Sequence, residues 1–174
     1  MFKDVAKDFY YLLHPKLAFF LTSIDRKGRA NVMTCAWATP VSEEPPMVVV
    51  CVSRGAHTAK LIRSTREFVI NIPTRDLLRQ LWFCGGISGR DTDKFSRAEL
   101  TPQPASLVKP PRVQGCIGYL ECRVCRTVPA GECYAFFGEV LAASAEGKYF
   151  SDGMWKPEAQ IPCHLAGKRM VFLR

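Results

Sequence analysis

The sequence predicts a mainly β protein with short helices, folded as an antiparallel barrel in a single domain over residues 1–174. A chain of this length can bury its own core, and its 48% hydrophobic and 23% charged residues are typical of a globular domain. Short runs rich in aromatic and β-branched residues recur between turn residues, which indicates strands. Consecutive hairpins of this kind favour an antiparallel barrel over a parallel βαβ sheet.

The first half of the chain contains a predicted helix followed by four predicted strands. Apolar residues recur at helical spacing in residues 4–13, and the His14-Pro15 step ends this helix. Strands are predicted at residues 16–24, 31–39, 47–52 and 67–72. They are separated by a hairpin turn at 25–28, a proline-rich connection at 40–46 and a short helix at 59–64.

The second half begins with a helix over residues 75–83, which Thr74 can cap. A glycine-rich loop at 84–93, a helical turn at 94–99 and a surface crossing at 101–111 follow. Two long strands are predicted at 116–127 and 132–142, and a short one at 169–173. We expect the helices to cover the open ends of the barrel.

The charge balance favours an anionic partner. Lys and Arg total 24 against 16 Asp and Glu, which gives a net charge of +8. Such an excess attracts nucleic acid, acidic protein surfaces or phosphorylated small molecules. The basic residues are scattered, with no dense tract, which argues against nucleic acid. A non-catalytic basic β-barrel that binds nucleic acid or another anionic ligand is nevertheless one alternative function.

The sequence gives no sign of a membrane segment or of a secretory signal. Its longest apolar runs fall far short of the roughly 20 residues that a spanning helix needs. The N-terminal residues lack a long apolar stretch followed by a small-residue cleavage site. We therefore expect a cytoplasmic protein that does not bind a membrane.

The eight cysteines are expected to remain thiols in that compartment. Cys122 and Cys125 form a CxxC pair, but side chains three apart on a strand point to opposite faces. No second CxxC or histidine pair completes a zinc site, so no metal is predicted. A zinc or thiol redox sensor that uses Cys116, Cys122, Cys125 and Cys133 is a further alternative.

Two segments have the composition of anion sites. Residues 53–58 lie between a strand and a helix, and they offer Ser53, Arg54 and Thr58 beside small residues. Backbone N–H groups at a helix start bind phosphate well. Residues 84–94 could form a flexible anion-binding lid. A capped turn and a solvated loop are the structural alternatives. The usual nucleotide-binding and hydrolase motifs are missing, and no catalytic residue is predicted.

A series of short motifs follows in order along nearly the whole chain. They are Asn31-Val-Met-Thr-Cys-Ala-Trp37, Thr39-Pro-Val-Ser42, Pro45-Pro46, Ser53-Arg54 with Thr58, Glu67-Phe-Val-Ile-Asn-Ile-Pro73, Gly85, Ser88-Gly89, Asp93-Lys94-Phe95, Leu120-Glu121-Cys122 and Gly138-Glu139-Val140. This series resembles the flavin reductase-like, FMN-binding split-barrel family, and in particular its flavoredoxin branch. Residues 143–164 match the pattern least well.

The resemblance implies a split β-barrel homodimer with FMN bound near the subunit interface. It implies that residues 31–37 line the isoalloxazine ring and that Ser53, Arg54 and Thr58 hold the phosphate. By the same analogy His164 approaches the reacting face of the flavin. The full set of implied cofactor-binding residues is Asn31, Thr34, Cys35, Ala36, Trp37, Ser53, Arg54, Thr58, Asn71, Ser88, Gly89, Lys94 and His164. For Cys35 packing in the core is the alternative, and for Asn71 it is hydrogen bonding to the backbone.

The function that the resemblance implies is an FMN-dependent oxidoreductase of the flavin reductase or flavoredoxin type. The cofactor would supply the chemistry, while the protein binds and orients it. Electrons would come from NADH or NADPH, or from a reduced redox protein. A basic surface would attract an acidic redox partner. The sequence leaves the choice of donor open.

Overall fold

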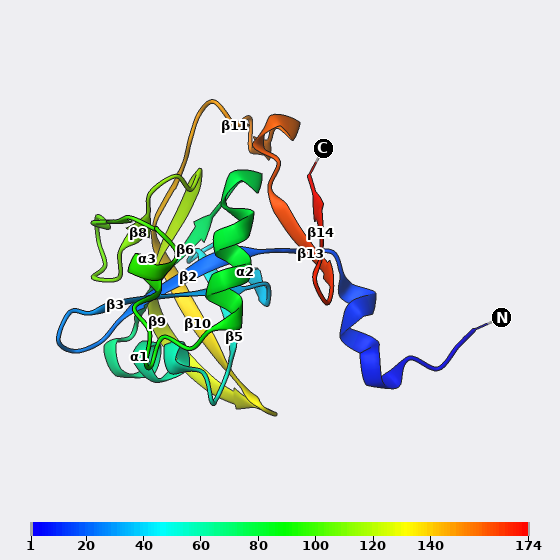
Figure 1. Cartoon of the computed structure of the whole chain (residues 1–174), viewed down its shortest axis with the longest axis horizontal. Helices are drawn as coiled ribbons and strands as arrows, with labels where there is room; N and C mark the ends of the chain where they lie inside the picture. The colour runs from blue at the N-terminus through cyan, green and yellow to red at the C-terminus, as the bar shows by residue number, and fades with distance from the viewer. Residues whose placement is uncertain (1, 174) are drawn as a thin grey trace.

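The computed structural model describes residues 2–173, which are built around a seven-stranded antiparallel sheet (Figure 1). The strand order across this sheet is β3-β2-β6-β9-β10-β5-β4. The strands are β2 (Phe19–Ile24), β3 (Ala30–Cys35), β4 (Ala38–Ser42), β5 (Met47–Ser53), β6 (Glu67–Ile72), β9 (Gly118–Ala130) and β10 (Cys133–Ala145). The predicted mainly β class with antiparallel pairing is confirmed.

The sheet curls until its two edges share one core. In residues 2–173 the edge strands β3 and β4 are not paired with each other. Nevertheless, Cys35 of β3 packs in the same cluster as Val50 and Val52 of β5, which lies next to the opposite edge. The backbone N–H of Cys51 also donates to the carbonyl of Trp37, in the link between β3 and β4. The result is a barrel that is open along one seam.

Short strands complete the topology. Strand β1 (Lys16–Leu17) pairs with β13 (Pro162–Ala166), which forms a hairpin with β14 (Arg169–Phe172). This hairpin brings the C-terminal residues beside the start of β2 (Figure 1). Two small pairs join β7 (Pro102–Gln103) to β8 (Arg112–Val113), and β11 (Phe150–Ser151) to β12 (Met154–Trp155).

Strand β2 is buried on both faces, which divides the core into two clusters. Because side chains alternate along a strand, Phe19 and Leu21 point into the barrel while Phe20 points out of it. The inner cluster includes Ile62 from α1 (His57–Thr65). The outer cluster includes Leu81 from α2 (Leu78–Gly86), and Phe95 from α3 (Lys94–Arg97).

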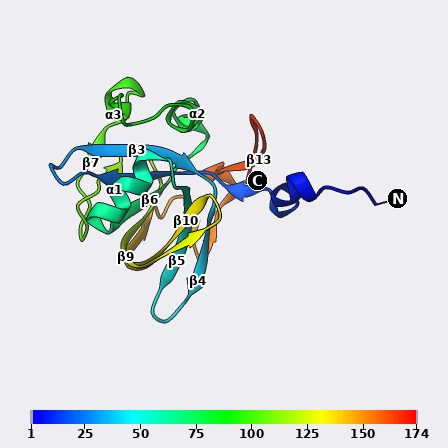
Figure 2. The same cartoon turned by 90° about the horizontal axis from the view of Figure 1, so that it is seen from below.

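The expected position of the helices was therefore wrong in part. Among the α-helices of residues 2–173 only α1 contributes to the inner cluster, which also holds Ala159 near the C-terminus, whereas α2 and α3 pack on the outer face of the sheet. Figure 2 shows α2 and α3 on one side of β3, and α1 with most of the barrel on the other. The N-terminal 3-10 helix η1 (Ala6–Leu13) extends away from the barrel in both views (Figures 1 and 2).

Several boundaries differ from the prediction. The strand expected at 31–39 breaks after Cys35, so Trp37 lies in a link and β4 takes part of the expected proline-rich connection. Thr74 caps the 3-10 helix η2 (Arg75–Leu77), which precedes α2, by accepting the N–H of Asp76. Helix α2 runs on to Gly86, into the expected loop. Strand β13 and the 3-10 helix η3 (Pro157–Ala159) were not predicted.

The crossing expected at 101–111 is held to the sheet by a buried glutamate. Glu121 of β9 has a fully buried side chain that accepts N–H bonds from Ser106 at 2.9 Å and from Leu107 at 2.6 Å. The guanidinium of Arg112 pairs with the same carboxylate at 2.6 Å. Burial raises the pKa of the Glu121 carboxyl, but these N–H donors and the Arg112 charge outweigh it and hold the pKa below its ordinary value.

In residues 2–173 no helix is both long enough and apolar enough to cross a bilayer.

We predict that Glu121→Gln lowers the free energy of unfolding at neutral pH by about 2–4 kcal/mol. The amide replaces one of the two acceptor oxygens with an NH2 donor that faces buried N–H groups, and it removes the negative charge that pairs with Arg112. Urea denaturation measures this, with the exposed Glu139→Gln as the matched control. The Glu121 pKa is depressed by folding. The stabilisation that the Glu121 carboxylate adds to the free energy of unfolding is therefore fully present above the ordinary glutamate pKa of about 4.3. It is lost as the pH falls through the lower pKa of the folded state. Equal unfolding free energies for the two variants would contradict this assignment.

Candidate functional site

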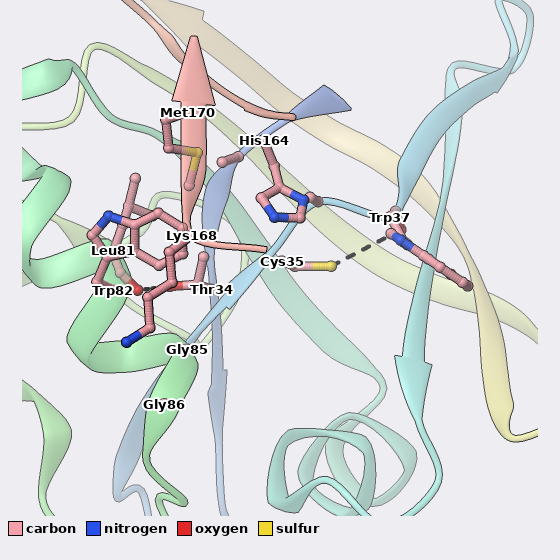
Figure 3. A pocket seen from close by; sticks show the side chains of 12 residues that line it. Thr34, Cys35, Trp37, Leu81, Trp82, Gly85, Gly86, His164, Lys168 and Met170 are labelled. Atoms are coloured by element: carbon pink, nitrogen blue, oxygen red, sulfur yellow. Dashed lines mark hydrogen bonds between the residues drawn. The ribbon is translucent and has the colours of Figure 1, made fainter. Parts of the chain in front are cut away.

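A cavity of about 940 Å³ opens where β3 ends, and we call it the apolar compartment (Figure 3). Three parts of the chain line it: the end of β3 with its link to β4, the C-terminal turn of α2, and the β13–β14 hairpin. Its lining residues are Ala18, Thr34, Cys35, Ala36, Trp37, Leu81, Trp82, Gly85, Gly86, His164, Lys168 and Met170.

Aromatic rings dominate this compartment. Trp37 is 37% exposed although it is a large apolar side chain, and Trp82 lies 6.5 Å from the His164 ring. Figure 3 shows Trp37 and Trp82 on opposite sides of His164. Burial raises the pKa of the Cys35 thiol to about 11, so this side chain stays protonated at neutral pH. The compartment can therefore hold a flat aromatic group, and it offers that group no thiolate.

A second cavity of about 360 Å³ adjoins the first, and we call it the polar compartment. The two compartments share Gly85 and Gly86 in their linings. The polar compartment is lined by Met33, Ser53, Gly55, Ala56, His57, Thr58, Cys84, Gly85, Gly86, Ile87, Ser88, Gly89 and Lys94. A ligand that passes the two glycines can occupy both spaces.

Lys94 places a buried positive charge in the polar compartment. The residue is 4% exposed, and its Nζ donates to the carbonyl of Cys84 at 2.8 Å. In the described residues Lys94 forms no ion pair. Burial lowers the pKa of its ammonium group. A buried ammonium with one neutral partner is costly, and an anionic ligand would stabilise it.

The start of α1 adds to the positive potential. Its N-cap residue is Ala56, so no capping side chain covers the N–H groups of His57 and Thr58 at the lining, whereas the N–H of Ala59 donates to the carbonyl of Ala56. The buried Nδ1 of His57 also has no hydrogen-bond partner among residues 2–173. Burial lowers the pKa of His57, and nearby cations, including Arg90, act in the same direction. The polar compartment is thus suited to a phosphate.

The structure brings eleven of the thirteen predicted residues to the two compartments. Thr34, Cys35, Ala36, Trp37 and His164 line the apolar compartment. Ser53, Thr58, Ser88, Gly89 and Lys94 line the polar one. The eleventh, Asn31, lies behind the polar lining and donates through Nδ2 to Thr58 Oγ1 at 2.9 Å and to Ser23 Oγ at 3.2 Å. Asn31 thus positions the Thr58 hydroxyl.

Two predicted residues lie elsewhere. The exposed guanidinium of Arg54 lies 5.3 Å from the centre of the Tyr134 ring, and its Nε donates to the carbonyl of Cys133. Asn71 is fully buried, and its Nδ2 donates to the carbonyl of Phe20. Its Oδ1 accepts the N–H of Val113 at 2.8 Å. Asn71 therefore serves the backbone of neighbouring strands, which was the alternative interpretation of this amide.

Sequence reasoning missed Trp82, Lys168 and Met170. Trp82 lies four residues before Gly86, so helical spacing places both on one face of α2, a signal that could have been used. No comparable signal marks Lys168 and Met170, because they enter the lining only through the unpredicted pairing of β13 with β1 and β14.

The CxxC pair behaves as its spacing predicts. Cys122 is fully buried in the inner cluster, whereas Cys125 is exposed on the other face of β9. Burial raises the pKa of the Cys122 thiol to about 12. The two sulfurs cannot bind one ion from opposite faces of a strand, which removes the basis for a chelating pair there.

Comparison with known proteins agrees with this geometry. The family described as flavin reductase-like domain matches residues 12–158. An uncharacterised protein of Archaeoglobus fulgidus is 35% identical over 146 residues, which cover 84% of this chain and 80% of the relative. The flavoredoxin of Methanosarcina acetivorans is 28% identical and has a TM-score of 0.81, with 94% of this chain and 85% of that chain covered.

The fold is also shared with more distant proteins. A putative flavin reductase with a split barrel domain from Shewanella frigidimarina superposes with a TM-score of 0.84 at 15% identity. The superposition covers 98% of this chain and 89% of that chain. The open-seamed barrel described above is therefore a split barrel, as predicted.

We predict that Gly89→Ala lowers the free energy of unfolding by about 1–3 kcal/mol. A Cβ on Gly89 would overlap Asn31 Oδ1 and would lie 3.3 Å from Lys94 Cε, while Asn31 is held by its bonds to Ser23 and Thr58. Gly55→Ala is the control, since a Cβ there meets no atom within 4 Å. Chemical denaturation of both variants is the measurement, and a Gly89→Ala protein as stable as Gly55→Ala would refute this packing.

Proposed function

This chain belongs to the flavin reductase-like domain family, and we propose that it is an FMN-binding oxidoreductase that passes electrons through the flavin. The observation that carries the proposal is the junction of an aromatic compartment with an electropositive one at Gly85 and Gly86. FMN has the same two-part form, because a flat ring system is joined by a short chain to a phosphate.

The polar compartment fits the phosphate end of FMN. A phosphate would supply the missing counter-charge to Lys94 and would accept N–H bonds from the uncapped start of α1. The hydroxyls of Ser53, Thr58 and Ser88 are further donors in the lining. Arg54 and Asn71 are left out of the proposed site because neither lines a compartment.

The apolar compartment fits the ring end. A Cβ added to Gly86 meets no atom within 4 Å, so the glycine leaves open space at the junction. The hydroxyl of Thr34 donates a hydrogen bond to the carbonyl of Leu81, and this bond holds α2 against β3 at the side of the cavity. Trp37, Trp82 and Met170 exclude water from a bound ring. Bound FMN would supply the electron-transfer chemistry, and these residues would bind and orient it.

We propose NADH or NADPH as the electron donor, with a reduced acidic redox protein as the second candidate. The net charge of +8 favours either of these anionic partners. Anaerobic addition of each donor to the FMN-loaded protein distinguishes them, because the true donor bleaches the flavin absorption. A flavin that none of them bleaches would contradict both.

We also propose a homodimer. Phe9, Leu12 and Leu13 on η1 are between 61% and 72% exposed, and η1 extends away from the barrel (Figure 1). Apolar side chains in such a projecting segment are stabilised when a second copy covers them. Sedimentation equilibrium is the test, and a monomer at micromolar concentration would contradict this part of the proposal.

We predict that Lys94→Met weakens FMN binding by about 10- to 100-fold, the size of a lost charge-assisted hydrogen bond of about 1.5–3 kcal/mol. Riboflavin, which lacks the phosphate, should bind the variant and the wild type equally well. Fluorescence titration measures both ligands, and the exposed Lys60→Met is the control for loss of a positive charge near the site. Equal losses for FMN and riboflavin, or no loss for either, would sink the phosphate assignment.

A further inference from the structure

His57 brings a titratable ring into the polar compartment. It is the first residue of α1, it lines the compartment beside Thr58, and its buried Nδ1 has no hydrogen-bond partner among residues 2–173. We infer that His57 recognises the phosphate of FMN as an imidazolium ion, so that the binding of FMN takes up a proton from solvent at Nδ1. This inference rests on the proposed function, because it takes the phosphate of FMN to be the anion in this compartment.

The unpartnered nitrogen is the structural observation that carries the inference. Buried polar atoms in proteins nearly always have a hydrogen-bond partner, so an exception calls for one. In residues 2–173 three buried side-chain nitrogen or oxygen atoms lack a partner, and the Nδ1 of His57 is the only one of them in the lining of either compartment. A phosphate dianion has only acceptor oxygens, so this nitrogen can bind it only as an N–H donor.

The charges around His57 keep its ring neutral while no anion is bound. Burial lowers the pKa of the ring below its ordinary value, and four nearby cations lower the pKa further: Arg90, Lys60, Arg29 and Lys94. These cations come from four separate parts of the chain, which are the loop after α2, α1 itself, the β2–β3 turn and the start of α3. The free protein therefore presents an uncharged imidazole among positive charges.

The acidic groups near the polar compartment do not offset these cations at the ring. Asp25 forms an ion pair within the β2–β3 turn, and Asp93 accepts an N–H bond at the start of α3. Asp91 lies with these two in the lining of a neighbouring cavity and not in the polar compartment. Cys84 stays a thiol at neutral pH, because burial raises its pKa to about 11. In the described residues no carboxylate forms an ion pair with His57.

A bound phosphate reverses this balance. Its negative charge favours the charged form of an adjacent imidazole, which raises the pKa of the histidine. A proton then passes from solvent to Nδ1 while Nε2 keeps its own, and the new N–H donates a charge-assisted hydrogen bond to a phosphate oxygen. At a pH between the pKa of the free protein and that of the complex, FMN binds together with up to one proton. Its affinity therefore falls as the pH rises through this interval.

Two alternative responses to the phosphate predict different proton counts. In the first, the neutral ring moves its proton from Nε2 to Nδ1, which supplies a hydrogen bond with no uptake from solvent. In the second, Lys94 gains the proton, because burial lowers the pKa of its ammonium group in the free protein. Uptake by Lys94 would survive the replacement of His57 and would disappear when Lys94 is replaced.

Calorimetric titration of the full chain with FMN counts the protons. Titrations at about pH 7 in two buffers of different ionisation enthalpy give the uptake per flavin, and we expect wild type to take up about half a proton or more. His57→Asn keeps a neutral N–H group near the position of Nδ1, and it should lose this uptake. A proton released by the phosphate itself is common to both proteins, so the difference between them isolates His57.

Two measurements on the wild type need no variant. Riboflavin, which lacks the phosphate, should bind without proton uptake. The nitrogen NMR signals of the His57 ring should show protons on both nitrogens in the FMN complex at about pH 7, and on one nitrogen in the free protein. The preference for FMN over riboflavin should fall about threefold between about pH 7 and pH 8.5, where the phosphate is already a dianion.

The matched control is His14→Asn. His14 also has a buried nitrogen without a partner, but it lies outside the linings of both compartments, so this variant should keep the wild-type uptake. No uptake by wild type, or an uptake that His57→Asn retains and Lys94→Met abolishes, would overturn the inference and leave the proposed function standing. Failure of wild type to bind FMN at all would overturn the proposed function and this inference with it.

Discussion

Strand β2 is buried on both faces, and this double burial determines where the helices and the two compartments lie. Phe19 and Leu21 need a covered barrel interior, while Phe20 needs a second layer outside the sheet. Helix α1 packs in the inner cluster and α2 packs in the outer cluster, so the two helices lie on opposite sides of β3 (Figure 2). The helix start of α1 and the glycine-rich end of α2 then meet beside β3, and the two compartments lie there. The site is a consequence of how the sheet buries its two faces.

The two ends of the site differ in their physical chemistry. At one end a buried ammonium, an uncapped helix start and an unpartnered histidine nitrogen together favour an anion. At the other end two tryptophans and the β13–β14 hairpin surround a space into which Cys35 brings a thiol that stays protonated, because burial raises its pKa to about 11. No side chain in this arrangement needs to supply acid, base or nucleophile if a bound flavin supplies the reaction. The protein contributes position, exclusion of water and charge.

Much of the fold could be predicted because its signals are local. Strand β6 has the predicted bounds, since four of its six residues are apolar and Pro73 follows its last residue. The strand predicted at 31–39 is interrupted at Ala36 and Trp37, where the chain passes from β3 to β4 and the carbonyl of Trp37 accepts the N–H of Cys51 from the opposite edge of the sheet. The predicted anion segment at 53–58 does line the polar compartment, but the sequence could not tell that Arg54 turns towards Tyr134. The burial of Lys94 and the contribution of Lys168 depend on contacts between distant segments, and no local pattern encodes them.

A crystal structure of the chain grown with FMN would show whether the flavin fills both compartments. We expect the phosphate within hydrogen-bond distance of Lys94 Nζ and of the first N–H groups of α1, with the connecting chain passing Gly85 and Gly86. We expect the ring in the apolar compartment, between α2 and the link that carries Trp37. A phosphate bound at Arg54, with Lys94 still paired only to the carbonyl of Cys84, would refute this placement, as would a flavin bound outside both compartments.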